Sequence, residues 1–516
     1  MWDAIVIGSG ISGLAAGAAL SRAGKRVLLL EQHMTPGGQT QTYRRGDWTF
    51  ATGVHYLAGV GPSYRAGGRF GRVIGQFGRL LDWLSDGQIQ FAPLANPYDI
   101  VRLPGFEFGI EHPEAAYRSA LLERFPHDAA DIDRWFDACH AAREQAYALL
   151  ALHSAPLWAT FALHMLRGAD LNRWARHTLA DELARISNDK LRAVLGTRWP
   201  DHGAPPSRAP FIEHAIVTGA YNEGAYYPVG GPARFAEVLA PLVSAAGGEL
   251  RLGADVRRIV VERGRAAGVV YSAGGEDREE RARHVIGAMG AANIVRALDP
   301  AVAHEWQQQV QAMQPGLSFL LLSIGFDGDI AAAGASSANV WIHESTEIER
   351  IWTYPGDGDA PGLFVSFQSL KDPAYRGLPT AEVLAMVDSG SFAQWLGDAQ
   401  APRQASYLAL KEKCAARMLA QFGRHFPSLA GMVRFHELAT PVTQQHYART
   451  PAGSIYGTEL SAERMTGPVL RVRTPVPGLA LAGQDVFGPG LPGSFASGLY
   501  AAAAVEPTLW PRLLQA

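Results

Sequence analysis

The sequence predicts an α/β fold in which a parallel sheet binds a dinucleotide and a second, α+β unit is interleaved with it. Three observations support this prediction. A strand, a glycine turn, a helix and a second strand occupy residues 1–31. Another strand, a Gly/Pro-rich turn and a helix occupy residues 479–505. Strand and helix patterns alternate between these two ends, which is typical of a doubly wound sheet.

The N-terminal unit has the spacing of a dinucleotide-binding site. An apolar strand over 4–7 leads into a Gly-x-Gly-x-x-Gly turn at Gly8, Gly10 and Gly13. The first glycine permits the tight turn, the second lets a pyrophosphate approach the backbone, and the third lets the helix pack against the sheet. The helix N-terminus then directs free N–H groups at the phosphates. Glu31 ends the second strand, where its carboxylate can accept the hydroxyls of an adenosine ribose.

The C-terminal segment predicts a second contact with the same ligand. An apolar strand ends at Gly483, and Asp485 follows two residues later. A turn over 488–493 then precedes a helix over 494–505. Asp485 can accept a hydrogen bond from a ligand hydroxyl, and the turn can bring backbone groups to a polar edge of the ligand. One cofactor would then join both ends of the chain.

The composition excludes several classes of protein. The formal net charge is −3 and no basic stripe is present, which argues against a nucleic-acid partner. The two cysteines form no C-x-x-C pair, and no His/Glu spacing suggests a metal site. The first strand begins at residue 3, which leaves no room for a signal peptide. We therefore expect a cytoplasmic protein without a metal or a disulfide.

One apolar stretch, 146–166, allows two interpretations. It contains no Asp, Glu, Lys or Arg, but Pro156 should divide it into two helices. It can be a buried helical hairpin that closes an apolar pocket. It can also be a peripheral contact with the inner face of the cytoplasmic membrane. No uninterrupted apolar run is long enough to predict a membrane span.

The alternation of patterns divides the chain into two discontinuous units. Residues 1–75, 216–310 and 431–516 are expected to form the cofactor-binding unit, and 76–215 and 311–430 the substrate-binding unit. Within the second unit we expect strands over 318–326 and 362–368. Helices are expected over 380–395 and 407–426.

Several segments resemble a known group of flavoproteins. The residues after Glu31, with the pair Gly37 and Gly38, resemble the FAD-binding start of glutathione-reductase-type flavoproteins, particularly the amine-oxidase and phytoene-desaturase branch. Residues 51–57, 227–231 and 478–485 resemble segments of retinol saturases and bacterial phytoene-desaturase-type carotenoid enzymes.

The resemblance implies a bound FAD and a lipophilic polyene or isoprenoid substrate in an apolar tunnel. It also implies redox chemistry at a carbon–carbon bond, in which the flavin carries the hydride. The expected cofactor contacts are Gly8, Gly10, Ser12, Gly13, Glu31, Gln32, Gly38, Gly53, Val54, Val256, Gly483, Asp485, Leu491, Pro492 and Gly493.

The candidate catalytic residues are two His–Tyr pairs. His55 and Tyr56 follow Gly53, the glycine expected on the flavin side. His446 and Tyr447 precede the C-terminal cofactor segment and are expected to line the same cavity. His55 can equally be a hydrogen-bonded core histidine. No second nucleotide fingerprint is present, so reduction of the flavin would need an external donor, a hydride from the substrate, or transient docking of NADPH.

Four functions fit these patterns. The first is saturation or desaturation of a carbon–carbon bond in a hydrophobic polyene by hydride transfer at the flavin. A redox-neutral double-bond isomerase or cyclase that uses reduced FAD is the second. An amine-oxidase-like enzyme and a non-catalytic isoprenoid-binding protein are the others, because fold alone does not establish chemistry.

Overall fold

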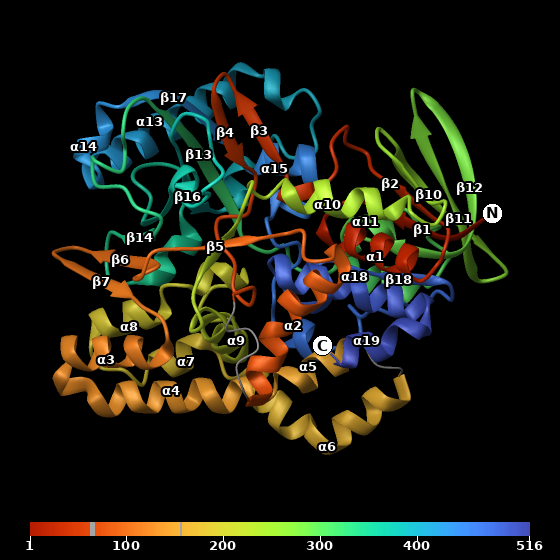
Figure 1. The fold of residues 1–516 in the computed structure, drawn as a ribbon, viewed down its shortest axis with the longest axis horizontal. Coiled ribbons are helices and arrows are strands. Elements are labelled where there is room, and N and C mark those ends of the chain that lie inside the picture. Colours follow the sequence, from red (N-terminus) through yellow and green to blue (C-terminus); the bar gives the residue numbers. More distant parts are fainter. Residues whose placement is uncertain (62–67, 155–156, 516) are drawn as a thin grey trace.

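Two seven-stranded sheets form the centre of the molecule, which we describe from a computed structural model (Figure 1). The structure describes residues 1–61, 68–154 and 157–515. The first sheet has the order β10 (Asp255–Glu262), β11 (Arg265–Ala273), β12 (Glu276–Gly287), β1 (Trp2–Ile7), β2 (Val27–Leu30) and β9 (Glu249–Arg251), and β18 (Leu479–Leu481) also pairs with β12. The fold class expected from the sequence is confirmed.

Strand β12 joins the two ends of the chain. Its C-terminal half pairs in parallel with β1 and with β18, whereas its N-terminal half pairs antiparallel with β11. The N-terminal and C-terminal strands therefore run side by side with one shared partner between them. The carboxyl ends of these parallel strands lie at one edge of the sheet, where α/β proteins bind their ligands.

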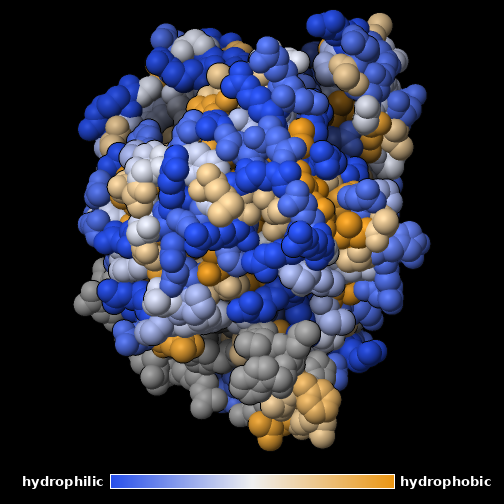
Figure 2. All heavy atoms as spheres, turned by 90° about the vertical axis from the view of Figure 1, so that its right-hand side faces the viewer, coloured by the Kyte–Doolittle hydropathy of each residue, from blue (hydrophilic) through white to orange (hydrophobic). Residues whose placement is uncertain are grey.

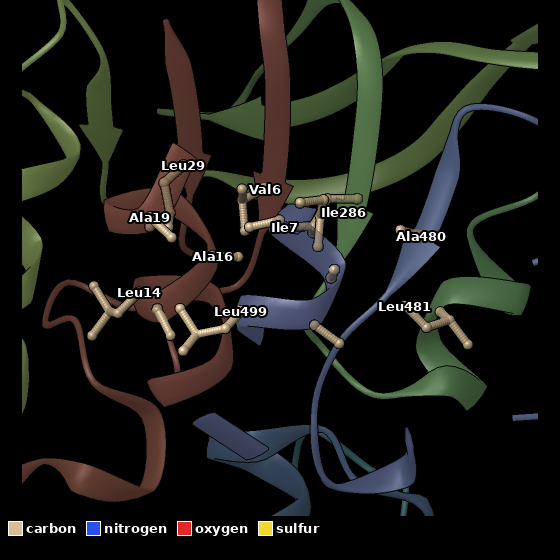
Figure 3. Packing of buried hydrophobic residues seen from close by; sticks show 14 of the residues in the cluster. Val6, Ile7, Leu14, Ala16, Ala19, Leu29, Ile286, Ala480, Leu481 and Leu499 are labelled. Carbon is tan, nitrogen blue, oxygen red and sulfur yellow. The ribbon is translucent and has the colours of Figure 1, made fainter. Parts of the chain in front are cut away.

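Helices α1 (Ile11–Arg22) and α18 (Leu491–Val505) pack together against this sheet. Figure 3 shows Leu14 and Ala16 of α1 beside Leu499 of α18, below Val6 and Ile286 of the sheet. Both helices are rich in Ala and Gly, and such small side chains allow close packing of helix against helix and sheet. The other helices of this unit are α10 (Arg234–Val243), α11 (Ala291–Arg296), α12 (His304–Gln311), α17 (Gln484–Phe487) and α19 (Trp510–Gln515).

The second sheet has the order β17 (Val433–Ala439), β13 (Ser318–Phe326), β16 (Thr380–Val387), β15 (Gly362–Ser366), β14 (Asn339–His343), β6 (Asp99–Leu103) and β7 (Phe106–Ile110). All its neighbouring strands are antiparallel except β14 and β6. Helix α13 (Ala405–His425) packs on this sheet, followed by α14 (Pro427–Ala430) and α15 (Pro441–Ala448). The division predicted at residue 431 is incorrect for β17, which completes the second sheet.

The helix expected over 380–395 is wrong. Residues 380–387 form strand β16, and a short 3₁₀ turn follows over Ser389–Phe392. Every residue of β16 is buried, because the strand lies in the sheet between β13 and β15. Tertiary packing on both faces has overridden the helix propensity of its Ala, Glu, Leu and Met residues.

A helical layer lies below the two sheets in the view of Figure 1. It contains α2 (Gly68–Ser85), α3 (Glu114–Arg124), α4 (Ala129–Arg143), α5 (Ala146–Ser154), α6 (Leu157–Arg176), α7 (Leu179–Leu183), α8 (Asp189–Gly196), α9 (Phe211–Tyr221) and α16 (Ala462–Thr466). There are also two small strand pairs, β3 (Thr42–Arg45) with β4 (Trp48–Ala51), which contacts β16, and β5 (Phe91–Pro93) with β8 (Tyr226–Pro228). Helices α5 and α6 flank Pro156, the predicted break, which lies outside the described residues.

The crossing of α1 and α18 predicts that Gly498→Ala destabilises the protein. A Cβ at Gly498 would lie 2.1 Å from the carbonyl oxygen of Ser12, which cannot move without displacing α1. We expect a loss of about 1–3 kcal/mol in the free energy of unfolding, as for other overpacked cores. Denaturant unfolding measures it. Gly431→Ala is the matched control, because Gly431 is exposed and has no atom within 4 Å of its Cβ position. Equal stability of the two variants would contradict the close crossing.

Candidate functional site

The glycine turn between β1 and α1 leaves open space in front of the helix. Gly8 has a φ of 98°, which favours glycine, and a Cβ at Gly13 would lie 1.8 Å from the carbonyl oxygen of Gly8. No atom lies within 4 Å of a Cβ at Gly10. The first helical hydrogen bond runs from Leu14 N–H to the Gly10 carbonyl, so the preceding N–H groups of α1 are outside the helical ladder. This turn fits a pyrophosphate.

The predicted ribose ligand, Glu31, is buried and held in place. Its Oε2 accepts hydrogen bonds from the backbone N–H and the hydroxyl of Ser9, both at 2.8 Å, and its Oε1 accepts one from His33 N–H at 2.8 Å. Gly38 approaches the turn closely, since its Cβ position is 3.1 Å from the Cα of Gly10. The carboxylate retains acceptor capacity for ribose hydroxyls, because each oxygen can accept more than one hydrogen bond.

Three other predicted contacts lie around this unit. Gln32 follows Glu31 and donates from its side chain to the Tyr447 carbonyl at 3.1 Å. Val256 lies on β10, two residues after Ala254, whose N–H donates to the Glu31 carbonyl at 2.8 Å. Ser12 is buried at the crossing of α1 with α18.

Asp485 joins three segments at the C-terminal end of the site. Its Oδ2 accepts a hydrogen bond from Ala291 N–H at 2.8 Å, at the start of α11. Its Oδ1 accepts two from Thr458, from the N–H at 2.9 Å and the hydroxyl at 3.0 Å. Gly483, with a φ of 118°, donates its N–H to the Ser497 hydroxyl at 2.7 Å. The Asp485 carboxylate therefore holds these segments together. A hydrogen bond from a hydroxyl of the cofactor would be an additional, predicted role.

A cavity of about 350 Å³ lies where the two ends of the chain meet the second sheet. One wall is formed by Gly53, Val54 and the turn 488–493, which includes Leu491, Pro492 and Gly493. The other walls are mostly apolar and come from α2, α5, α9 and the second sheet. Among the residues that form them are Phe77, Leu80, Leu149, Ile216, Val217, Trp341, Phe364, Leu384, Met386, Ile455 and Leu460. Such walls suit a lipophilic ligand.

His55 and Tyr56 both line this cavity. His55 Nδ1 lies 3.0 Å from Oε2 of the fully buried Glu382, and the His55 ring is largely enclosed. Tyr56 stacks on Tyr221 with ring centroids 4.6 Å apart. Its hydroxyl lies 3.3 Å from Asp201 and 3.5 Å from Asp99. His55 is thus a hydrogen-bonded residue of the core, and it also lines the cavity. A role in catalysis stays a prediction.

The structure does not bring the second predicted pair, His446 and Tyr447, to the cavity. Both are exposed on α15, and Tyr447 is 58% accessible to solvent. Tyr447 contacts His33, with ring centroids 5.7 Å apart, close to the predicted ribose site. The prediction that this pair lines the cavity is wrong, because α15 packs against the second sheet and presents these two side chains to solvent.

A buried polar network lies behind the Tyr56 wall. Arg198 donates to Asp99 at 2.6 Å and contacts the rings of Tyr98 and Tyr221, with its guanidinium carbon 4.9 and 4.6 Å from their centroids. Lys371 donates to the His55 carbonyl at 2.8 Å. Burial lowers the pKa of Lys371 to about 7. The network fixes the backbone of the predicted catalytic segment from the side opposite the cavity.

Two carboxyl groups that sequence analysis missed, Asp201 and Glu213, also line the cavity. Asp201 lies in a 3₁₀ turn (Trp199–His202), and Glu213 lies on α9. Burial raises the pKa of each carboxyl to about 7. No motif surrounds either residue, so only the tertiary structure reveals them.

These features define a two-unit fold with a glycine turn suited to a dinucleotide, a buried acid at the end of β2 and an apolar cavity where the two ends of the chain meet the second sheet. Residues 6–70 match the NAD(P)-binding Rossmann-like domain, and residues 202–506 match the flavin-containing amine oxidoreductases. The chain belongs to the flavin-containing amine oxidoreductase family. It is a flavin-dependent oxidoreductase with FAD as its cofactor, and the open space at Gly10 and the buried acid Glu31 fit this group.

Individual relatives refine this assignment. The chain is 31% identical to the all-trans-retinol 13,14-reductase of Rattus norvegicus, over 98% of this chain and 85% of the relative. It is 24% identical to the chloroplastic prolycopene isomerase of Arabidopsis thaliana, over 89% and 74% of the two chains. A solved structure of putrescine oxidase bound to putrescine has the same fold, with a TM-score of 0.65 and 15% identity over 98% of both chains. The resemblance to retinol saturases is confirmed.

The open space at Gly10 predicts that Gly10→Val folds but loses FAD. The backbone there is extended (φ −62°, ψ 175°), so valine fits the fold, but its side chain fills the space proposed for the pyrophosphate. We expect at least a tenfold weaker affinity, measured by the flavin absorbance retained after gel filtration and by titration with FAD. Gly431→Val serves as the control. Full flavin content in Gly10→Val would refute the pyrophosphate assignment.

Proposed function

We propose that this protein saturates a carbon–carbon double bond of a hydrophobic polyene with FAD as the hydride carrier. The observation that carries the proposal is the apolar cavity, whose walls include both the flavin-side segments, Gly53–Val54 and 488–493, and the aromatic side chains Tyr56, Tyr221 and Phe364. A conjugated chain in this cavity would lie beside the flavin in a space that excludes water. The similarity to a retinol reductase over nearly the full chain supports saturation over the other directions.

The second candidate is a redox-neutral double-bond isomerase. The similarity to a prolycopene isomerase supports it, at lower identity and coverage. Both reactions need the same cavity and cofactor, and they differ in whether the product gains two hydrogen atoms. Saturation also needs a reductant for the flavin, and we propose an external hydride donor such as NADPH.

We further propose that helix α6 contacts a membrane surface. Its exposed side chains include Phe161, Met165 and Leu166, which are 69%, 74% and 82% accessible. Hydrophobic residues appear at the lower end of the molecule in Figure 2, the end at which Figure 1 shows α6. Helix α5, which packs on α6, lines the cavity with Ala146, Leu149 and His153. A lipophilic substrate would thus have a short path from a bilayer into the cavity.

None of the helices in the described part of the chain has the length and apolar character that a membrane span requires. The contact that we propose for α6 is a peripheral one.

The saturase proposal predicts the mass of the product. FAD-loaded protein is reduced with dithionite without oxygen and mixed with all-trans-retinol or a lycopene-like polyene. We expect the flavin to reoxidise as substrate is consumed, and the product to carry two additional hydrogen atoms by mass spectrometry. A product of unchanged mass with the flavin still reduced would instead establish the isomerase. Absence of any reaction with every polyene would reject both functions.

The membrane proposal predicts that polar residues on α6 weaken binding to vesicles. The triple variant Phe161→Ser, Met165→Ser, Leu166→Ser removes three exposed apolar side chains without opening the core. We expect a loss of at least tenfold in partitioning to phosphatidylcholine/phosphatidylglycerol vesicles, measured by sedimentation. Leu408→Ser, an exposed leucine on α13, is the control. Equal partitioning of the two variants would reject the contact.

A further inference from the structure

Saturation of a double bond requires a proton as well as a hydride, and the proton must come from a group that faces the cavity. Within the described chain, the carboxyl groups that line the cavity are Asp201 and Glu213. The lining tyrosines Tyr56, Tyr221 and Tyr456 are weaker acids, because burial raises the pKa of each well above its usual value. His55 also lines the cavity, and its Nδ1 lies 3.0 Å from the carboxylate of the buried Glu382. Among the acidic side chains of the lining, the choice of proton donor is between the two carboxyls.

Asp201 lies at the edge of the aromatic wall. Its Oδ2 is 3.3 Å from the Tyr56 hydroxyl, and the Tyr56 ring stacks between Tyr221, at 4.6 Å, and Phe364, at 6.1 Å. A polyene packed against these rings would place its conjugated carbons next to this carboxyl. The titratable and charged groups that face Asp201 are Arg198, Asp99, Tyr56, Tyr221 and Tyr456.

The neighbouring carboxylate, Asp99, explains why Asp201 can hold a proton. Arg198 donates to Asp99 Oδ2 at 2.6 Å, and Asn339 donates to Asp99 Oδ1 at 2.9 Å. Asp99 thus has two side-chain donors of its own, whereas the hydrogen-bond partner of Asp201 is a hydroxyl. Burial and the charge of Asp99 raise the pKa of Asp201, against the opposing effect of Arg198.

We propose that Asp201 is the general acid of the reaction, an inference that rests on the saturase function above. Bound FAD in its reduced form would supply a hydride, with both electrons, to one carbon of the double bond. The O–H bond of the Asp201 carboxyl breaks, and its proton forms the new C–H bond at the adjacent carbon. Asp201 is left as a carboxylate and regains a proton from solvent before the next turnover. The external hydride donor restores the reduced cofactor.

Glu213 is the competing donor, and its position differs. In the described part of the chain its side chain has no hydrogen-bond partner, and its Oε1 lies 3.4 Å from the Cβ position of Gly488. It thus faces the turn proposed to hold the flavin, whereas Asp201 adjoins the aromatic wall proposed for the polyene. This difference favours Asp201 as the donor. Substitution of each residue in turn distinguishes the two.

The kinetic test follows reoxidation of dithionite-reduced, FAD-loaded protein by all-trans-retinol at a series of pH values. For wild type we expect the rate to fall as the pH rises through about 7, because the protonated Asp201 is then lost. Asp201→Asn keeps the size and hydrogen-bonding capacity of the side chain but cannot donate an acidic proton. We expect it to be roughly 10²–10⁴-fold slower and to lose the alkaline fall. Asp201→Glu should recover part of the rate, and Glu213→Gln should keep the alkaline fall.

A second measurement does not depend on turnover. Infrared difference spectra of the oxidised protein between acid and alkaline pH should contain a protonated-carboxyl band that Asp201→Asn removes. Flavin content and thermal midpoint establish that each variant folds. A folded Asp201→Asn protein with wild-type rate and pH profile would overturn the assignment, as would loss of the alkaline fall in Glu213→Gln instead. If the wild-type protein reduces no polyene, the proposed saturase function is wrong. If the wild type is active and Asp201→Asn is equally active, only the assignment of Asp201 is wrong.

Discussion

The pairing of β1 and β18 with the same strand, β12, is the constraint on which the rest of the structure depends. It brings residues nearly 480 positions apart into one parallel array, with Ile7 and Leu481 both opposite Gly287. The turns that follow these strands then open at the same edge, and their helices α1 and α18 cross at Ser12 and Gly498. A cofactor bound to one turn must therefore lie beside the other, so the fold makes one site from two distant segments.

The turns that follow these strands are encoded by local residues, so the sequence predicts them well. The roles of Gly8, Gly10 and Gly13 follow from their spacing, and the structure shows the positive φ, the open space and the close approach that those roles require. Glu31 directly follows β2, and the length of the apolar run is enough to predict this position. The same reasoning extends to the C-terminal strand, turn and helix.

The parts that could not be predicted depend on contacts between distant residues. Asp201 meets Tyr56 across 145 positions, and no spacing rule connects a 3₁₀ turn in the helical layer with a loop after β4. Strand β16 has a helix-forming composition, and only its burial between two strands makes it extended. His446 and Tyr447 precede a cofactor segment in the sequence, yet α15 presents both to solvent. A residue's closeness in sequence to a cofactor motif predicted its place in the site only where that residue directly follows a strand of the sheet.

The apolar character of the cavity links substrate binding to acid chemistry. Walls that accept a polyene also remove water from Asp201 and Glu213, and a carboxyl without water or a cation of its own holds its proton more strongly. The same carboxyls in a solvated cleft would be ionised near neutral pH and unable to donate. Behind the wall, Arg198 stays charged because Asp99 and two tyrosine rings surround it. Arg198 and Asp99 thus lie behind the aromatic layer of Tyr56 and Tyr221, whereas the carboxyls Asp201 and Glu213 line the cavity.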